Sequence, residues 1–284
     1  MSKLVAFIDG SIYSKSVCEH AAWLARETGL PLEVLHVLGR REISSTPSDL
    51  SGSISLGARS SLLKELTELD EQRAQLAQKR GRLILNEAKT ALNEAGVQSV
   101  STRLRTGDIL AAVEEYEDLA EMLVVGKRGE AADFARLHLG SNLERIVRSS
   151  RKPILVASRS YKPVQKVLVT FDGGPSCRKA ISYMARGPLF ADLACHLLLV
   201  GEDSDSNRQS LEAARKELEE ASRVVTTERL QGQPEKLIAR AVENEAANLL
   251  VMGAYGHSRI RSLIIGSTTS EMIRSCPIPV LLFR

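Results

Sequence analysis

An internal repeat constrains the fold of this chain more than any other feature of its sequence. Residues 121–129 (EMLVVGKRG) match residues 248–256 (NLLVMGAYG), since each is an apolar run, a glycine, two residues and a second glycine. The segments that follow also correspond: GSNLERIVRSS from Gly140 matches GSTTSEMIRSC from Gly266, and each leads into a Pro-led apolar run. The openings, LVAFID and VLVTFD, end in Asp9 and Asp172. We therefore predict that the 284-residue chain is a duplicated domain.

Short apolar runs alternate with helical patterns in both repeats, which is typical of a parallel sheet covered by helices on both faces. The fold class predicted is α/β, with two tandem doubly wound domains at 1–160 and 161–284 and an insertion near 40–75. Strands are expected at 4–8, 32–38, 98–105, 121–125 and 153–157, and near 166–171, 194–200, 224–230, 248–252 and 278–283. A polar loop is expected at 44–61, and an amphipathic helix at 62–95.

Composition excludes several classes of protein. Hydrophobic residues make up 43% and charged residues 26% of the chain, values close to those of globular proteins. The net charge of +3 gives no basis for a nucleic-acid partner, and no apolar run is long enough to cross a membrane. The four cysteines are scattered without a CxxC, which indicates buried free thiols, and no metal site is expected. A signal-peptide pattern is absent from the start, so we expect a cytoplasmic protein.

The glycine segments predict an anion site at the carboxyl ends of the strands. In an open parallel sheet, ligands bind beyond these ends, where the strand order reverses. Gly253 and Gly256 follow an apolar strand, and Gly266-Ser267-Thr268 opens a helix whose free N–H groups and positive dipole end favour a phosphate. Ser267 or Thr268 is expected to cap this helix. A loop of this kind also serves as an ordinary turn and cap, but its occurrence in two copies favours the functional interpretation.

The arrangement Gly253-x2-Gly256-x9-Gly266-Ser267-Thr268 resembles the ATP-binding signature of the universal stress protein family, in the HUP group of α/β folds. The resemblance covers both repeats from first strand to last. It implies a five-stranded parallel sheet of order 3-2-1-4-5 in each domain. ATP or AMP would bind across the switch point, either with or without Mg²⁺. It further implies roles in the second repeat: Asp172 and Val200 facing adenine and ribose, Met252 and Gly253 lining the nucleoside, and Gly256, Gly266, Ser267 and Thr268 holding phosphates.

The first repeat matches the same signature less closely. Asp9 and Val37 are in place, but ten residues separate Gly129 from Gly140-Ser141, one more than in the pattern, and Asn142 replaces a hydroxyl residue. Gly126 matches Gly253, the first glycine of the signature. Lys127 and Arg128 are interpreted either as phosphate contacts or as solvated loop residues. The second repeat is therefore the better candidate site.

No catalytic constellation accompanies the glycine loops, so we expect a binding module rather than an enzyme. Phosphoryl transfer needs several carboxylates to hold a metal ion and a base near the phosphate, and Asp172 alone does not provide both. The preferred hypothesis is a nucleotide-sensing stress-response protein. The alternatives are a nucleotide-free interaction protein that uses the helix at 62–95, and an adenylate-handling enzyme. The resemblance also implies that 153–157 and 278–283 pair within the chain as a pseudo-dimer, and it leaves open a homodimer of two chains.

Overall fold

A computed structural model describes residues 2–39, 56–129, 141–254 and 265–284, and the side chains of 56–61 and 141 are outside the description. The first repeat contains β1 (Lys3–Phe7), α1 (Ser14–Thr28), β2 (Leu32–Leu38), α3 (Leu56–Glu94), β3 (Val100–Thr106), α4 (Ile109–Tyr116), β4 (Ala120–Gly126), α5 (Ser141–Ser149) and β5 (Ile154–Ala157). The second contains β6 (Lys166–Thr170), α6 (Pro175–Arg186), η2 (Pro188–Phe190), β7 (Ala194–Val200), α7 (Asp205–Glu220), β8 (Val225–Leu230), α8 (Pro234–Asn244), β9 (Leu249–Gly253), α9 (Ser267–Ser275) and β10 (Val280–Phe283).

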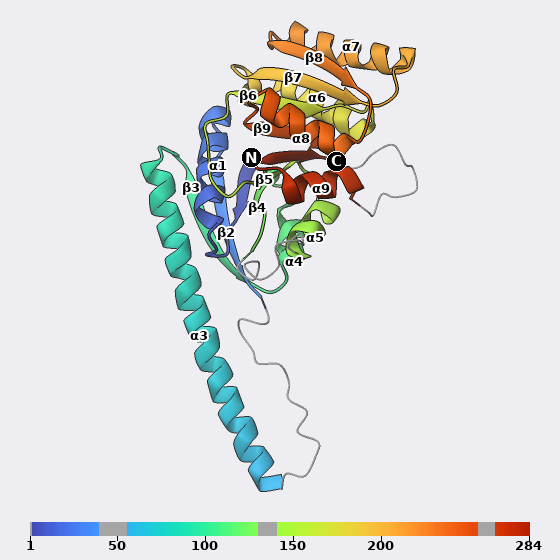
Figure 1. Cartoon of the computed structure of the whole chain (residues 1–284). Coiled ribbons are helices and arrows are strands. Elements are labelled where there is room, and N and C mark those ends of the chain that lie inside the picture. Colours follow the sequence, from blue (N-terminus) through green and yellow to red (C-terminus); the bar gives the residue numbers. More distant parts are fainter. Residues whose placement is uncertain (1, 40–55, 130–140, 255–264) are drawn as a thin grey trace.

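The strands form one ten-stranded sheet of order β3-β2-β1-β4-β5-β10-β9-β6-β7-β8 (Figure 1). Read within each repeat, this is the order 3-2-1-4-5 twice, as the resemblance implied. β5 and β10 pair antiparallel, with Leu155 opposite Leu281, whereas their other neighbours run parallel. The last strands of the two repeats therefore meet as expected, and the strand order reverses at β1/β4 and at β6/β9.

Helices cover both faces of this sheet, so its inner strands are largely apolar on both sides, whereas the edge strands β3 and β8 carry exposed polar residues. One apolar cluster collects residues of α1, α6, α7 and the C-terminal part of α3 on one face. A second cluster collects residues of α4, α5, α8 and α9 on the other. All four cysteines are free and buried, as predicted. Within the described ranges, no helix has both the length and the apolar character needed to span a membrane.

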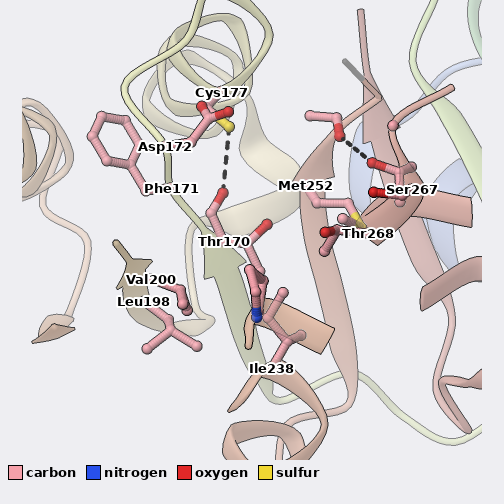
Figure 2. A pocket seen from close by; sticks show the side chains of 14 residues that line it. Thr170, Phe171, Asp172, Cys177, Leu198, Val200, Ile238, Met252, Ser267 and Thr268 are labelled. Atoms are coloured by element: carbon pink, nitrogen blue, oxygen red, sulfur yellow. Dashed lines mark hydrogen bonds between the residues drawn. The ribbon is translucent and has the colours of Figure 1, made fainter. Parts of the chain in front are cut away.

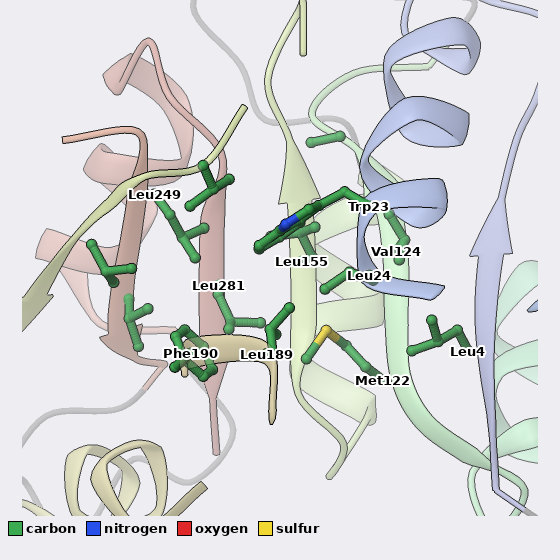
Figure 3. Close-up of a cluster of buried hydrophobic side chains, with 14 of the residues drawn as sticks. Leu4, Trp23, Leu24, Met122, Val124, Leu155, Leu189, Phe190, Leu249 and Leu281 are labelled. Carbon is green, nitrogen blue, oxygen red and sulfur yellow. The ribbon is translucent and has the colours of Figure 1, made fainter. Parts of the chain in front are cut away.

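The joint between the repeats is a continuous apolar core supported by two reciprocal polar contacts. Figure 3 shows Trp23 of α1 and Leu155 of β5 beside Leu189, Phe190 and Leu281 of the second repeat, all buried in one cluster. The two contacts each join one repeat to the C-terminal end of a helix in the other. Lys127 Nζ donates to the Cys276 carbonyl after α9 (2.6 Å), and Arg284 Nη1 donates to the Arg148 carbonyl in α5 (2.8 Å).

Helix α3 is the main difference between the repeats. It takes the place between the second and third strands that α7 takes in the second repeat, but it has 39 residues against 16. Its backbone begins at Leu56, six residues before the predicted start, so the helix includes the Gly- and Ser-containing residues 57–61, for which the sequence predicts a loop. Figure 1 shows its N-terminal half projecting away from the sheet.

Candidate functional site

A cavity of about 310 Å³ opens at the carboxyl ends of β6, β7 and β9, at the switch point of the second repeat. Leu198, Val200, Ile238 and Met252 give it apolar walls, and Figure 2 shows Asp172 on the side opposite Ser267 and Thr268. Its complete lining is Thr170, Phe171, Asp172, Cys177, Leu198, Val200, Pro234, Ile238, Met252, Gly253, Gly266, Ser267, Thr268 and Thr269. The cavity thus joins an apolar slot to a polar edge.

Two glycines shape the wall of the cavity. Gly173 follows Asp172 with a φ of +74°, a backbone conformation that residues with a Cβ rarely adopt, and this turn lets the Gly174 N–H donate to Asp172 Oδ1 (2.8 Å). At Gly253, an added Cβ would lie 3.0 Å from Ser176 Cβ and 3.2 Å from Cys177 Sγ. The end of β9 can therefore approach α6 this closely only because position 253 is glycine.

The N-terminus of α9 borders the polar edge of the cavity, and its first backbone N–H groups have no partner within the helix. Its N-cap residue is Gly266 (φ −56°, ψ 144°), and no side chain of the described residues caps the helix. The expectation that Ser267 or Thr268 caps it is wrong: Thr268 Oγ1 donates to Glu235 Oε1 (2.7 Å), and Ser267 is exposed. Thr269 Oγ1 donates to the Gly253 carbonyl (3.0 Å) instead. The first turn of α9 thus keeps N–H donors and dipole available for an anion.

Glu235 and Cys177 are the two titratable groups beside the site that sequence reasoning missed. Glu235 lies in the first turn of α8, and the Thr268 hydroxyl holds the pKa of its carboxyl below the ordinary value. Burial, and then the charge of Asp172, raises the pKa of the Cys177 thiol to about 12, and Cys177 Sγ donates to the Thr170 carbonyl (3.4 Å; dashed in Figure 2). Cys177 is therefore a neutral packing residue.

The corresponding region of the first repeat is packed differently. Phe7 and Leu143 stand where the repeat alignment has Thr170 and Thr269, and both are buried in one apolar cluster. Lys127 donates to the Cys276 carbonyl in the second repeat, a contact that neither predicted role includes, and burial lowers its pKa to about 8. Asp9 Oδ1 accepts the Ser11 N–H (3.0 Å).

Helix α3 and the glycine loop both approach the Asp9 turn of the first repeat. A Cβ added at Gly10, where φ is +77°, would lie 2.6 Å from Ile84 of α3. One added at Gly129 would lie 2.8 Å from Asp9 Oδ2. In the second repeat, a Cβ at Gly173 would come no nearer to α7 than 3.8 Å, at Ser210. The first repeat is thus more crowded at this turn.

Comparison with known proteins places this architecture in a family. The model of the universal stress protein family matches residues 1–158 and again 163–284. The chain belongs to the universal stress protein family. It is 41% identical to the universal stress protein Slr1230 of Synechocystis over 287 residues, which is 100% of both chains. A universal stress protein of Mycolicibacterium smegmatis is 24% identical, over 92% of this chain and 91% of its own length.

A solved universal stress protein has the same tandem fold. The crystal structure of the protein from Archaeoglobus fulgidus superposes with a TM-score of 0.75 over 100% of this chain and 99% of that one, at 21% identity. This likeness concerns the fold. Two domains of the universal stress protein type are therefore arranged here in one chain, as the repeat predicted.

The structure brings together most of the site residues chosen from the sequence of the second repeat. The cavity is lined by Asp172, Val200, Met252, Gly253, Gly266, Ser267 and Thr268. Gly256 and Gly140 lie outside the described residues, and so does the side chain of Ser141. In the first repeat, Gly129 lies against Asp9. Val37 follows the buried His36 in β2, and Gly126 ends β4, where an added Cβ would lie 3.1 Å from Tyr13 Cβ.

Proposed function

We propose that the second repeat binds an adenine nucleotide and that the protein is a nucleotide-responsive stress-response module rather than an enzyme. The observation that carries this proposal is the convergence of seven sequence-selected residues on one cavity beside an uncapped helix N-terminus. A volume of about 310 Å³ lies at the lower end of the range for small-molecule sites. Apolar walls with a few polar groups at one edge match a flat base joined to a phosphate.

Each end of the cavity suits one part of the ligand. Leu198, Val200 and Met252 offer apolar contact to a base. The Asp172 carboxylate accepts hydrogen bonds, which suits a ribose hydroxyl or an exocyclic amine. The N–H groups at the start of α9 suit the phosphates, because the dipole and the free donors act together on an anion.

We further propose one nucleotide per chain, bound in the second repeat. The bulkier Phe7 and Leu143 take the places of two cavity-lining threonines, and Lys127 is engaged across the joint between the repeats. These differences reduce the space and the polar groups available in the first repeat. The extra residue before Gly140 also shifts its signature.

We also propose that the protein does not hydrolyse the bound nucleotide at an appreciable rate. Within the described ranges, no group of three His, Cys, Asp or Glu side chains is placed to hold a metal ion. Asp172 lines the cavity and Glu235 accepts a hydrogen bond from its lining residue Thr268, and Mg²⁺, if it enters, would arrive with the nucleotide phosphates. Binding would act by shifting an equilibrium between two states of the protein or its assemblies, through a difference in affinity for them.

The substitution Gly266→Asp separates binding from folding. The backbone angles at Gly266 suit an N-cap aspartate, whose carboxylate would accept N–H groups of the first turn of α9 and stabilise the helix by a few tenths of a kcal/mol relative to glycine. The same carboxylate would occupy the phosphate position. We expect the affinity for ATP and AMP, measured by calorimetric titration with and without Mg²⁺, to fall at least about tenfold. The melting temperature should not fall.

A control variant and a control ligand sharpen this test. Gly201→Asp adds the same charge just after β7, outside the cavity lining, where an added Cβ meets nothing closer than 3.7 Å. It should bind ATP as the wild type does. Adenosine, which lacks phosphates, should bind equally to Gly266→Asp and wild type. Unchanged ATP affinity in Gly266→Asp would refute the proposed phosphate position.

A second candidate function, a nucleotide-free interaction module, is favoured by one observation, the exposed leucines of α3. Leu69 and Leu76 are 47% and 64% exposed, although leucine is usually buried. If neither ATP nor AMP binds or shifts the melting temperature, this alternative replaces the nucleotide proposal.

A further inference from the structure

Residues 62–83 of α3, here called the arm, carry exposed apolar side chains. At the other end of the helix, Leu85, Ala88 and Leu92 are buried against the sheet. Along the arm, by contrast, leucines are exposed: Leu63 48%, Leu69 47%, Leu76 64% and Leu83 62%. Most helices in proteins owe their stability to packing of an apolar face, so this exposed face indicates a partner.

The leucines of the arm follow a heptad pattern. Leu62, Leu69, Leu76 and Leu83 are each seven residues apart. If these leucines occupy the d positions of a heptad, the a positions between them hold Leu66, Arg73 and Arg80. A seven-residue apolar repeat forms the seam of a coiled coil, while a charged residue at an a position selects among partners at some loss of stability.

Charge is strongly separated along the same arm. The stretch 64–71 contains one basic and four acidic residues: Lys64, Glu65, Glu68, Asp70 and Glu71. The stretch 73–82 contains four basic residues and none that are acidic: Arg73, Lys79, Arg80 and Arg82. Arg59 lies further out, but within the arm the outer stretch 64–71 is acidic and the stretch 73–82 next to the body is basic, so two arms complement each other when they run antiparallel.

We propose that two copies of this chain associate through their α3 arms as an antiparallel coiled coil. In this arrangement the acidic stretch of each arm lies along the basic stretch of the other. One register packs Leu66 against the partner's Leu76 and places Glu65 beside the partner's Lys79. Arg73 then lies opposite the partner's Leu69, where its aliphatic stem covers the leucine and its guanidinium reaches the acidic edge.

A parallel pairing fits the same sequence poorly. In register, it would stack Arg73 on the partner's Arg73 and Arg80 on the partner's Arg80, and it would bring Glu65 near the partner's Asp70, so like charges would meet at several levels. A second copy in the antiparallel sense satisfies both the leucine pattern and the charge pattern. This association leaves the β5–β10 joint and the cavity untouched.

The mass of the full-length protein in solution tests the association. We expect sedimentation or light scattering to give twice the 31.0 kDa of one chain at micromolar concentration. The variant Leu69→Gln/Leu76→Gln should raise the dimer dissociation constant at least tenfold. Its far-UV circular dichroism should show that the protein remains folded. The control Leu119→Gln, at another exposed leucine, should remain dimeric. A monomeric wild type, or a dimer that survives the double substitution, would overturn the proposal.

Charge reversal tests the antiparallel register. Glu65→Lys and Lys79→Glu should each weaken the dimer, because each brings two like charges together across the pair. The double reversal should restore the wild-type dissociation constant to within about twofold, because it exchanges the two charges. Additive weakening in the double variant would refute this register. ATP affinity, measured on the same samples, should be the same in all these variants.

Discussion

His20 gives the stability of the protein a defined dependence on pH. Its side chain is fully buried in α1, where Nδ1 donates to the Ser16 carbonyl (2.7 Å) and the ring meets Tyr161 edge-on at 5.0 Å. Nε2 has no hydrogen-bond partner among the described residues, so a second proton there would be a buried, unpaired charge. Burial lowers the pKa of His20 from 6.5 to about 4.

The sign and size of the effect follow from this lowered pKa. In the unfolded chain His20 regains its ordinary pKa, so on acidification the unfolded state takes up the proton first. Stability is therefore complete above pH 6.5 and is lost as the pH falls toward about 4. The slope is about 1.4 kcal/mol per pH unit between these values, which gives about 2 kcal/mol between pH 7.5 and pH 5.

Urea unfolding of the wild type and of His20→Gln, at pH 7.5 and pH 5, measures this contribution. Trp23, the only tryptophan, lies one turn from His20 in the same core and reports unfolding by fluorescence. The wild type should lose about 2 kcal/mol more than the variant on acidification. His36→Gln, which removes a buried histidine bonded to the Ile8 carbonyl (2.8 Å), should keep the His20 contribution. Equal losses in the wild type and His20→Gln would show that protonation of His20 does not cause the loss of stability.

Three further substitutions test individual contacts. Glu235→Gln should raise the affinity for Mg²⁺-free ATP about two- to fivefold, with less effect when Mg²⁺ is present, because it removes a negative charge beside the phosphate edge; weaker binding in a titration would contradict this. Gly253→Ala should destabilise the protein by about 1–3 kcal/mol in urea unfolding, since its Cβ would press on Ser176, whereas Gly201→Ala should be nearly neutral. Arg284→Gln should lower the free energy of unfolding by about 1 kcal/mol, because a cation leaves the C-terminal carbonyls of α5; no change would count against that contact.

Much of the fold was predictable because the sequence pattern of the domain occurs in two copies. Apolar runs ending in Asp9 and Asp172 marked the first strands, and the Pro-led runs after Pro153 and Pro279 marked the last ones. The family resemblance then supplied the strand order, which periodicity alone does not contain. The extent of α3 was less predictable, because Ser and Gly between 51 and 61 favour a loop locally.

The site was predictable where one segment carries it and not where distant segments meet. The spacing of Gly266 and its neighbours predicts the N-terminus of the helix. The bond from Thr268 to Glu235, however, joins residues 33 positions apart, and Lys127 reaches a carbonyl 149 residues away. Such contacts depend on the packing of α8 and α9 and on the β5–β10 joint, so no local pattern could reveal them.

The number of nucleotides bound per chain tests the central proposal most directly. The protein as purified would be denatured and the released nucleotide quantified by chromatography, and the emptied, refolded protein would be titrated with ATP and AMP. We predict a single site per chain that is lost in Thr170→Phe, which places in the cavity the residue found at the matching position of the first repeat. No bound nucleotide and no binding in the titration, or full binding by Thr170→Phe, would contradict it.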